Sequence, residues 1–141
     1  ISVIGLKDEP GIAFKLFNLL AKDNINVDVI LQSIGRENSK DISFTVSRDD
    51  ADNAVKILEE NMSRIGGKSI SCRRDVAKVS IVGAGIMSNP GVAAKMFEAL
   101  YNNNINISMI STSEIRVTVL IDERDAERAV NAVHDAFGLE E

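Results

Sequence analysis

The sequence predicts an α+β fold made of two copies of a βαββαβ unit, each an antiparallel sheet with two helices on one face. Three observations predict this fold: an internal repeat, apolar stripes at helical spacing, and short β-like runs between them. Residues 10–33 match residues 90–113 with 11 identities in 24 positions. A second block repeats at an offset of 75, where residues 50–55 match residues 125–130. Two copies of one unit therefore account for the chain.

The same order of elements is expected in each copy. A strand leads through a Pro-Gly turn into an amphipathic helix. An Asn-rich break ends that helix because Asn tolerates the left-handed conformation. Two strands follow, and a second helix starts at an Asp that can cap its free N–H groups. Strands are expected at 2–5, 25–34 and 41–46 in the first copy, and at 79–83, 105–112 and 116–121 in the second. The expected buried stripes are Ile12, Leu16, Leu19 and Leu20, then Ala51, Ala54, Val55, Leu58 and Met62; in the second copy they are Val92, Met96, Ala99 and Leu100, then Ala126, Ala129, Val130, Val133 and Phe137.

The repeat predicts two domains, at residues 1–75 and 76–141. Residues 68–73 alternate weakly and supply a fourth strand to the first domain. The second domain is incomplete, because only four residues follow Phe137. Its last strand is either missing or supplied from outside this segment. Since Ile1 already lies inside a β-like run, we expect the segment to be part of a longer chain.

Composition excludes several classes of function. The net charge is −5 and the basic residues are scattered, so the electrostatic footprint of a nucleic-acid-binding protein is missing. No apolar run approaches the roughly 18–20 residues that span a bilayer. Cys72 is the only cysteine, so an internal disulfide is impossible and a cytoplasmic location is expected.

The most informative segment is the strand-to-helix turn at residues 6–13. It places free backbone N–H groups and the positive end of a helix beside the carboxylate of Asp8. A helix N-terminus favours an anion and the carboxylate favours a cation, so together they suit an amino acid. Gly11 permits close approach of a ligand or of another backbone. The competing interpretation is that Pro10 and the acidic residues are ordinary helix-start chemistry.

Several stretches carry a family resemblance. The turn Asp8-x-Pro-Gly-x-Ala resembles the effector loop of ACT domains, the small ligand-binding modules of amino-acid metabolism. The stretches at 26–32 (Asn-Val-Asp-Val-Ile-Leu-Gln), 82–86 (Val-Gly-Ala-Gly-Ile) and 110–116 (Ile-Ser-Thr-Ser-Glu-Ile-Arg) resemble the tandem regulatory region of aspartate kinases. The resemblance covers essentially the whole chain. It implies ACT domains of the ferredoxin-like βαββαβ type.

The resemblance implies a function in feedback control. Aspartate kinases phosphorylate the side-chain carboxylate of aspartate with ATP, and their ACT pair binds lysine, threonine or both and inhibits the kinase. This segment is expected to be non-catalytic and to need no cofactor, since ATP and magnesium belong to the kinase domain. Expected partners are lysine or threonine, the kinase catalytic domain or subunit, and a second copy in a homodimer paired through ACT domains; neither nucleic acid nor a membrane is expected.

Effector residues follow from the same resemblance. One site is expected to use Asp8, Gly11, Ile12, Ala13 and Gln32, with Asn106 and Ile107 from a second-type module. The other is expected to use Asn26, Val27 and Asp28 with Gly91, Val92, Ala93 and Ser113. Ser88 and Asn89 replace Asp8 and Glu9 in the second turn, so its acidic partner is missing there. Asp28 could supply that charge.

Other chemistries fit the sequence less well. Residues 82–88 imitate a dinucleotide fingerprint, but it lacks its third Gly, and the strand expected at 105–112 has no acidic residue. His134 has no Cys or second His nearby to complete a metal site. Cys72 is interpreted as a small buried or edge residue. The hydroxyl groups of residues 111–113 have no His or Lys base that would make one of them a catalytic nucleophile. The main alternative is an ACT-type subunit or stand-alone sensor of another biosynthetic enzyme; an enzyme in its own right is disfavoured because no catalytic constellation is visible.

Overall fold

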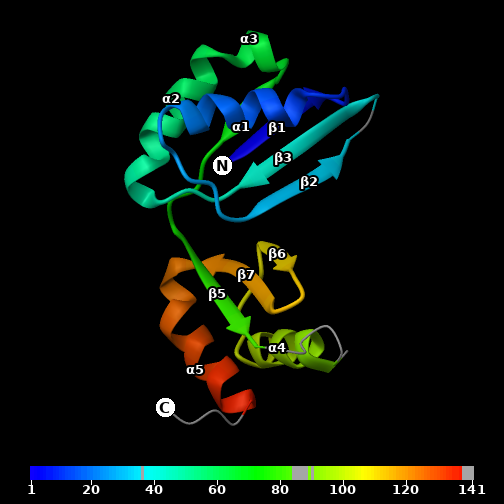
Figure 1. Ribbon diagram of the computed structural model, residues 1–141. Coiled ribbons are helices and arrows are strands. Elements are labelled where there is room, and N and C mark those ends of the chain that lie inside the picture. Colours follow the sequence, from blue (N-terminus) through cyan, green and yellow to red (C-terminus); the bar gives the residue numbers. More distant parts are fainter. Residues whose placement is uncertain (36, 84–88, 90, 138–141) are drawn as a thin grey trace. The chain divides into compact units, whose positions relative to one another are not determined.

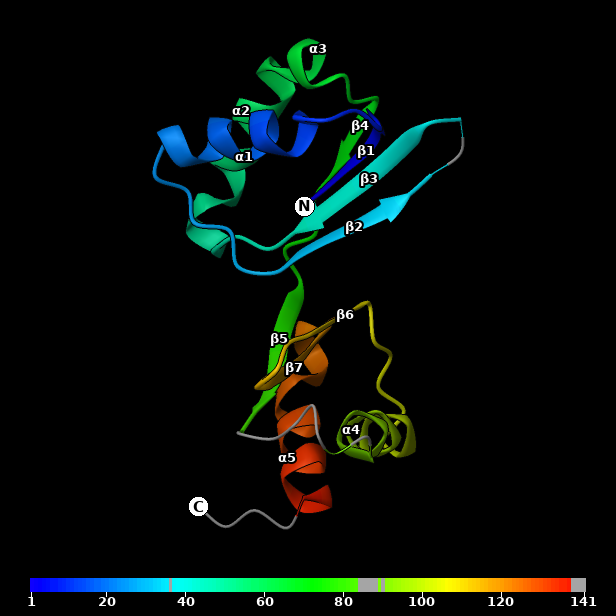
Figure 2. The ribbon, with the colours of Figure 1, turned by 45° about the vertical axis from the view of Figure 1, so that its right-hand side comes forward.

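The computed structural model describes residues 1–35, 37–83, 89 and 91–137. The chain divides into two compact units, Ile1–Arg74 and Asp75–Glu141. Each unit is an antiparallel sheet with helices on one face (Figures 1 and 2). The predicted fold class is confirmed.

The first unit contains a four-stranded sheet in the order β2-β3-β1-β4, with neighbouring strands antiparallel. This is the βαββαβ topology that the repeat predicts. Helices α1 and α2 lie on the same face of the sheet (Figure 2). The elements are β1 (Ser2–Lys7), α1 (Ile12–Lys22), β2 (Ile30–Ile34), β3 (Ser39–Phe44), a 3-10 turn (Arg48–Asp50), α2 (Ala51–Glu60), α3 (Met62–Ile65) and β4 (Ser69–Ser71).

The second unit repeats this order with three strands, arranged β5-β7-β6 among its described residues. The second domain was expected to lack its last strand. The residues that follow Phe137, 138–141, lie outside the described residues. The elements are β5 (Val76–Val82), α4 (Gly91–Asn102), β6 (Met109–Thr112), β7 (Arg116–Asp122), a 3-10 turn (Glu123–Asp125) and α5 (Ala126–Ala136).

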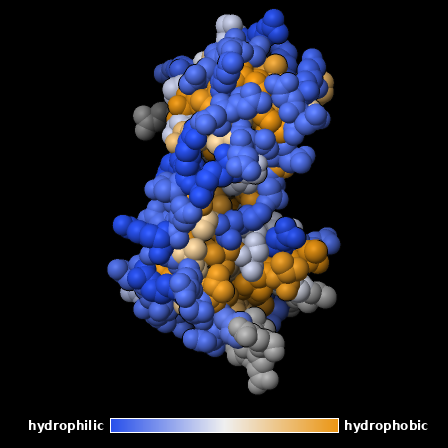
Figure 3. Space-filling model, turned by 90° about the vertical axis from the view of Figure 1, so that its left-hand side faces the viewer, coloured by the Kyte–Doolittle hydropathy of each residue, from blue (hydrophilic) through white to orange (hydrophobic). Residues whose placement is uncertain are grey.

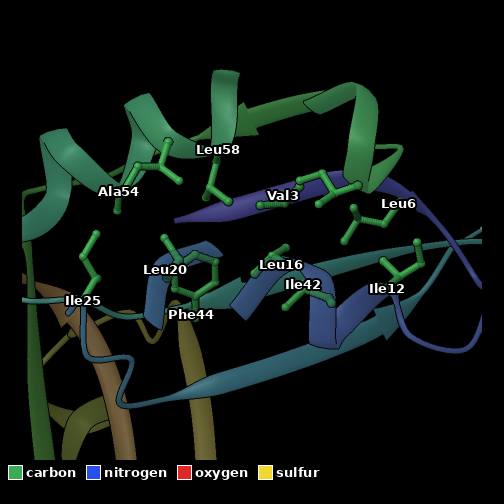
Figure 4. Close-up of a cluster of buried hydrophobic side chains, with 12 residues drawn as sticks. Val3, Leu6, Ile12, Leu16, Leu20, Ile25, Ile42, Phe44, Ala54 and Leu58 are labelled. Carbon is green, nitrogen blue, oxygen red and sulfur yellow. The ribbon is translucent and has the colours of Figure 1, made fainter. Parts of the chain in front are cut away.

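Each unit has its own hydrophobic core between sheet and helices. In the first unit Leu16 and Leu20 of α1 are fully buried against β1 and β3 (Figure 4). Phe17 packs edge-on against Phe44, with ring centroids 5.5 Å apart. Burying one leucine side chain such as Leu16 or Leu20 stabilises a fold by about 1.5–3 kcal/mol. The second core is built from Val79, Met96, Leu100, Ile105, Val117, Val119, Ile121, Ala129 and Val133.

The Asn-rich breaks end the first helix of each unit as predicted. Asn24 and Asn104 have φ values of 58° and 57°, which is the left-handed conformation. The next residue then donates its N–H back to the helix, from Ile25 to the Leu20 carbonyl at 3.1 Å and from Ile105 to the Leu100 carbonyl at 3.0 Å. These bonds satisfy carbonyls that would otherwise lack a partner at the helix end.

Three details of the predicted helices were wrong. The acids before α2 and α5 make no side-chain caps, because a 3-10 turn precedes each helix. The Asp50 carboxylate instead accepts a hydrogen bond from the Ser47 hydroxyl at 3.0 Å. In α2 Ile57 is buried where Val55 was expected, and in α5 Val130 is 53% exposed. A stripe read from spacing alone cannot tell how far the facing sheet extends over the helix.

The face shown in Figure 3 is mostly hydrophilic, with hydrophobic side chains reaching it in both units. The exposed large hydrophobic residues include Phe14, Ile34 and Tyr101. None of the described helices is long and apolar enough to cross a membrane.

Candidate effector site

The turn between β1 and α1 is anchored to the β2–β3 hairpin. The Asp8 amide donates to the carbonyl of Asn38 at 2.8 Å. Just upstream, β1 changes register between Val3 and Leu6, and the Gly5 amide there donates to the Asp41 carboxylate at 2.9 Å. The backbone leading into the turn is therefore held at two points, by Asn38 just before β3 and by Asp41 within it.

Helix α1 begins without a side-chain cap. Its N-cap is Gly11, which has no side chain to cap the helix. The Ile12 amide donates a long hydrogen bond of 3.5 Å to the Glu9 carbonyl. The first amides of a helix have no partner within the helix, so this turn presents donors and the positive end of the helix dipole. Such a terminus suits the carboxylate of an amino acid.

Gly11 is required by its conformation. Its φ is 88°, and a Cβ built there would meet no atom within 4 Å. Among the described residues, nothing beyond its chain neighbours occupies the side of Gly11 on which a side chain would lie. The left-handed φ alone therefore explains why a glycine occupies this position. The space where a side chain would lie is open to a ligand.

Lys40 of β3 lies beside this turn and was not predicted from the sequence. Its Nζ lies 3.8 Å from Asp8 Oδ1, and its side chain is 8% exposed while that of Asp8 is 46% exposed. The acid expected to receive a ligand ammonium thus already faces a buried cation. The available signal was the alternation Lys40, Ile42, Phe44, which places this lysine on the buried face of β3.

Gln32 lies on the same face of the sheet as Lys40. It is paired in register with Ile42, and Ile34 is paired with Lys40. Directly paired residues of antiparallel strands point to the same side. Gln32 is nevertheless exposed, since β2 is the edge strand. Its amide is therefore available to a ligand or partner at this edge.

Asn26, Val27 and Asp28 lie in the segment that joins α1 to β2. The Asp28 amide donates to the Thr45 carbonyl at 3.1 Å, while Val27 packs against the core. Asn26 and Asp28 are exposed. This segment follows the C-terminal end of α1, whereas the Asp8 turn precedes its N-terminal end (Figure 1). The two predicted groups of the first unit therefore lie at opposite ends of one helix.

The second unit has the same arrangement. Gly91, Val92 and Ala93 begin α4, and Asn106 and Ile107 follow it. The Ser108 amide donates to the Leu120 carbonyl at 2.8 Å, as the Asp28 amide does to Thr45. Ser113 lies in the β6–β7 hairpin, where its amide donates to the Arg116 carbonyl at 2.8 Å.

The second turn differs from the first in chemistry. The Asn89 side-chain oxygen accepts from the Gly91 amide at 3.3 Å, at the position that Glu9 has in the first copy. The replacement Ser88, Pro90 and most of the segment 82–86 lie outside the described residues. Each predicted site combines the turn of one unit with the loop of another, so these pairings remain predictions.

A separate polar groove lies on the second unit, between α5 and the end of α4. It shares no residue with the predicted effector groups. Two of its arginines already pair with acids, Arg124 with Asp122 at 3.4 Å and Arg128 with Asp125 at 2.8 Å. No group of three or more potential metal ligands occurs in the part of the chain that the structure describes. The groove is lined by Asn103, Arg124, Glu127, Arg128, Asn131, Ala132 and Asp135.

The ACT domain family model matches residues 1–62 and 79–137. The chain therefore belongs to the ACT domain family. In the crystal structure of aspartokinase α and β subunits, a chain 46% identical to this one superimposes with a TM-score of 0.90, over 98% of this chain and 90% of that one. The ligand-free regulatory subunit of aspartate kinase from Thermus thermophilus is 47% identical, with a TM-score of 0.88 over 96% and 89% of the two chains.

Full-length relatives give the same assignment. An aspartate kinase of Stutzerimonas stutzeri is 45% identical over 140 residues, which cover 99% of this chain and 34% of that protein. The chain thus spans about a third of the length of the curated relative it matches. It is a regulatory ACT region of the aspartate kinase type, and the resemblance seen in the sequence is confirmed.

Proposed function

We propose that this chain senses lysine or threonine and passes their binding to an aspartate kinase catalytic domain or subunit as feedback inhibition. The proposal rests on the N-terminus of α1, where Gly11 is the N-cap, no side chain caps the helix and Asp8 lies nearby. This terminus offers amide donors to the carboxylate of an amino acid and the Asp8 carboxylate to its ammonium. The similarity to aspartate kinase regulatory chains supports the same function.

The proposed mechanism is a shift between two arrangements of the regulatory modules. The effector binds one arrangement better, and that arrangement holds the kinase inactive. Such coupling between sites is typically about 1–3 kcal/mol, or roughly 5–150-fold in affinity. The proposed sites combine the residues around Asp8 and Gln32 with Asn106 and Ile107, and those around Asn26 and Asp28 with the start of α4 and Ser113.

A thermal-shift screen with the twenty amino acids tests ligand sensing directly. A ligand that binds only the folded state stabilises it by RT ln(1 + L/Kd), where L is the free ligand concentration, and so raises the melting temperature. Lysine or threonine should raise it, while their D-enantiomers, which reverse the geometry of ammonium and carboxylate, should not. If no amino acid at millimolar concentration shifts the transition, the proposal is wrong.

Asp8→Ala tests the role of the first turn. This substitution should weaken effector binding at least several-fold in calorimetric titration, since it removes the acid offered to the ligand ammonium. A control is Glu59→Ala, which removes an exposed acid from α2. Equal affinity of wild type and Asp8→Ala would remove Asp8 from the site.

We also propose that two copies pair through their ACT domains. The edge strand β2 leaves ladder groups open and exposes Ile30 and Ile34 at 49% and 81%, and open apolar edges favour pairing with another strand. Sedimentation equilibrium should give twice the mass of the chain. The double substitution Ile30→Lys with Ile34→Lys should then give the single mass, and a wild-type monomer would contradict the proposal.

A further inference from the structure

Lys40 is a buried cation on the core side of β3. Its neighbours in register are Leu6 on β1 and Ile34 on β2, and it follows the alternation that buries Ile42 and Phe44. Lysine is among the residues least often buried, because removing its ammonium from water costs several kcal/mol unless a partner compensates. Its place in the core-facing row therefore calls for an explanation.

The partner of Lys40 is Asp8, 3.8 Å away. The ammonium is nearly enclosed while the carboxylate is about half exposed, so one side of Asp8 faces the protein and the other faces the open turn. A charge held in a buried position is screened by salt and water much less than a surface charge. The carboxylate of Asp8 therefore faces the open turn with a fixed positive charge behind it, which partly offsets its negative charge.

We infer that Lys40 is a specificity-determining residue that makes the Asp8 turn favour amino acids with uncharged side chains over those with a cationic side chain. This inference rests on the proposed function of the turn. The ammonium and carboxylate common to all amino acids meet Asp8 and the amides of α1. A second ammonium on the ligand is repelled by the fixed charge of Lys40, while Asp8 is already engaged by the ammonium common to all amino acids.

Substituting Lys40 by Met tests this selectivity. Met has nearly the same length and no charge, so it removes the desolvated ammonium and still fills its place in the core. Asp8 remains solvated because it is about half exposed. The ratio of lysine to threonine affinity should rise roughly three- to tenfold, as expected for one charge removed at a separation of several ångströms.

The measurement is calorimetric titration with lysine and with threonine. Only binding that the Asp8→Ala substitution weakens is assigned to this turn and used for the ratio. Lys40→Gln should shift the ratio in the same direction as Lys40→Met, and thermal melts check that both variants fold. The matched control is Lys15→Met, which changes the net charge equally but removes an exposed lysine of α1. It should change the ratio by less than about twofold, because solvent screens that charge.

The outcomes separate the two levels of the inference. A higher ratio in both Lys40 variants and an unchanged ratio in Lys15→Met supports it. Binding of either amino acid to wild type with the same ratio in the Lys40 variants overturns the role of Lys40 alone. Absence of binding to wild-type protein overturns the proposed function and this inference with it.

Discussion

Gly11 and Gly91 are equivalent positions of the repeat, yet only Gly11 has a positive φ, at 88°. Alanine at Gly11 would have to adopt a left-handed conformation, at a cost of roughly 1–2 kcal/mol. At Gly91, which begins α4, a Cβ would meet only the Asn89 side-chain oxygen at 3.7 Å. The same substitution should therefore have different effects in the two units.

We expect Gly11→Ala to lower the free energy of unfolding by about 1 kcal/mol or more, and Gly91→Ala to change it by a few tenths. Urea denaturation of both variants beside wild type measures the difference. Equal losses in the two variants would show that the left-handed turn of the first unit is not the source of the cost.

Asn24 gives a second residue-scale prediction. Its φ of 58° is favourable for Gly, tolerable for Asn and costly for Ala. Asn24→Ala should destabilise the protein by about 1 kcal/mol, whereas Asn24→Gly should be neutral within a few tenths. Thermal melts of the two variants test this, and a Gly variant as unstable as the Ala variant would contradict it.

At this scale the sequence predicted the backbone of the first turn and of the helix ends, where local conformation decides it. The Asn-rich helix ends and the Pro-Gly turn follow from local conformational preferences, so Asn24, Asn104 and Gly11 could be interpreted directly. Lys40 was missed because its importance depends on a contact with Asp8, 32 positions away in the sequence. Alternation marks a position as buried, but it does not identify the partner.

Strand boundaries show a limit at the scale of elements. Residues 25–34 were predicted as one strand, but β2 covers only Ile30–Ile34. Ile25 and Val29 are buried and Val27 packs against the core, so the segment alternates like a strand. Its backbone instead forms isolated bonds to Thr45. Periodicity reports which side chains are buried, and a loop crossing the core can produce it as well as a strand.

The end of the first unit is tied to the start of α2 by two arginines. Arg74 donates to the Asp52 carboxylate, and the Arg48 guanidinium donates to the Arg74 carbonyl at 3.1 Å. The hydrogen bond and charge of Arg74 hold the pKa of Asp52 below its usual range. A lowered carboxyl pKa stabilises the fold above the ordinary value near 4, and that contribution disappears as the pH falls through the folded-state pKa.

Asp52→Asn should therefore destabilise the protein slightly at pH 7 and not at a pH well below the folded-state pKa. Because both partners are exposed, the difference should also shrink in 1 M salt. Urea denaturation across pH and salt measures it, with Glu59→Gln as a control for loss of an exposed acid on the same helix. A difference that persists at low pH would show that Asp52 acts through something other than its charge.

At the scale of the whole molecule, the repeat predicted two units, and the structure has two separate cores. Which surfaces form the proposed effector sites could not be predicted from the sequence, since each proposed site needs the turn of one unit and the loop of another. A repeat reports how each unit folds on its own. It contains no information on which neighbouring surfaces meet.

The separate cores predict that each unit can be destabilised without opening the other. Leu20 and Leu100 are equivalent in the repeat, and both are 0% exposed, one in each core. Leu→Ala in a core costs about 2–5 kcal/mol, because it loses burial and leaves a cavity. Amide exchange protection falls in the cooperative unit that loses stability.

Hydrogen exchange of the intact chain should therefore show faster exchange in β1, β3 and α1 for Leu20→Ala, with β5, β7 and α4 unchanged. Leu100→Ala should give the reverse pattern. Each variant serves as the control for the other, because the chemical change and the position in the fold are the same. If either substitution accelerated exchange equally across residues 1–74 and 75–137, the chain would unfold as a single cooperative unit, and the stability of the turn before α1 could not be altered independently of that before α4.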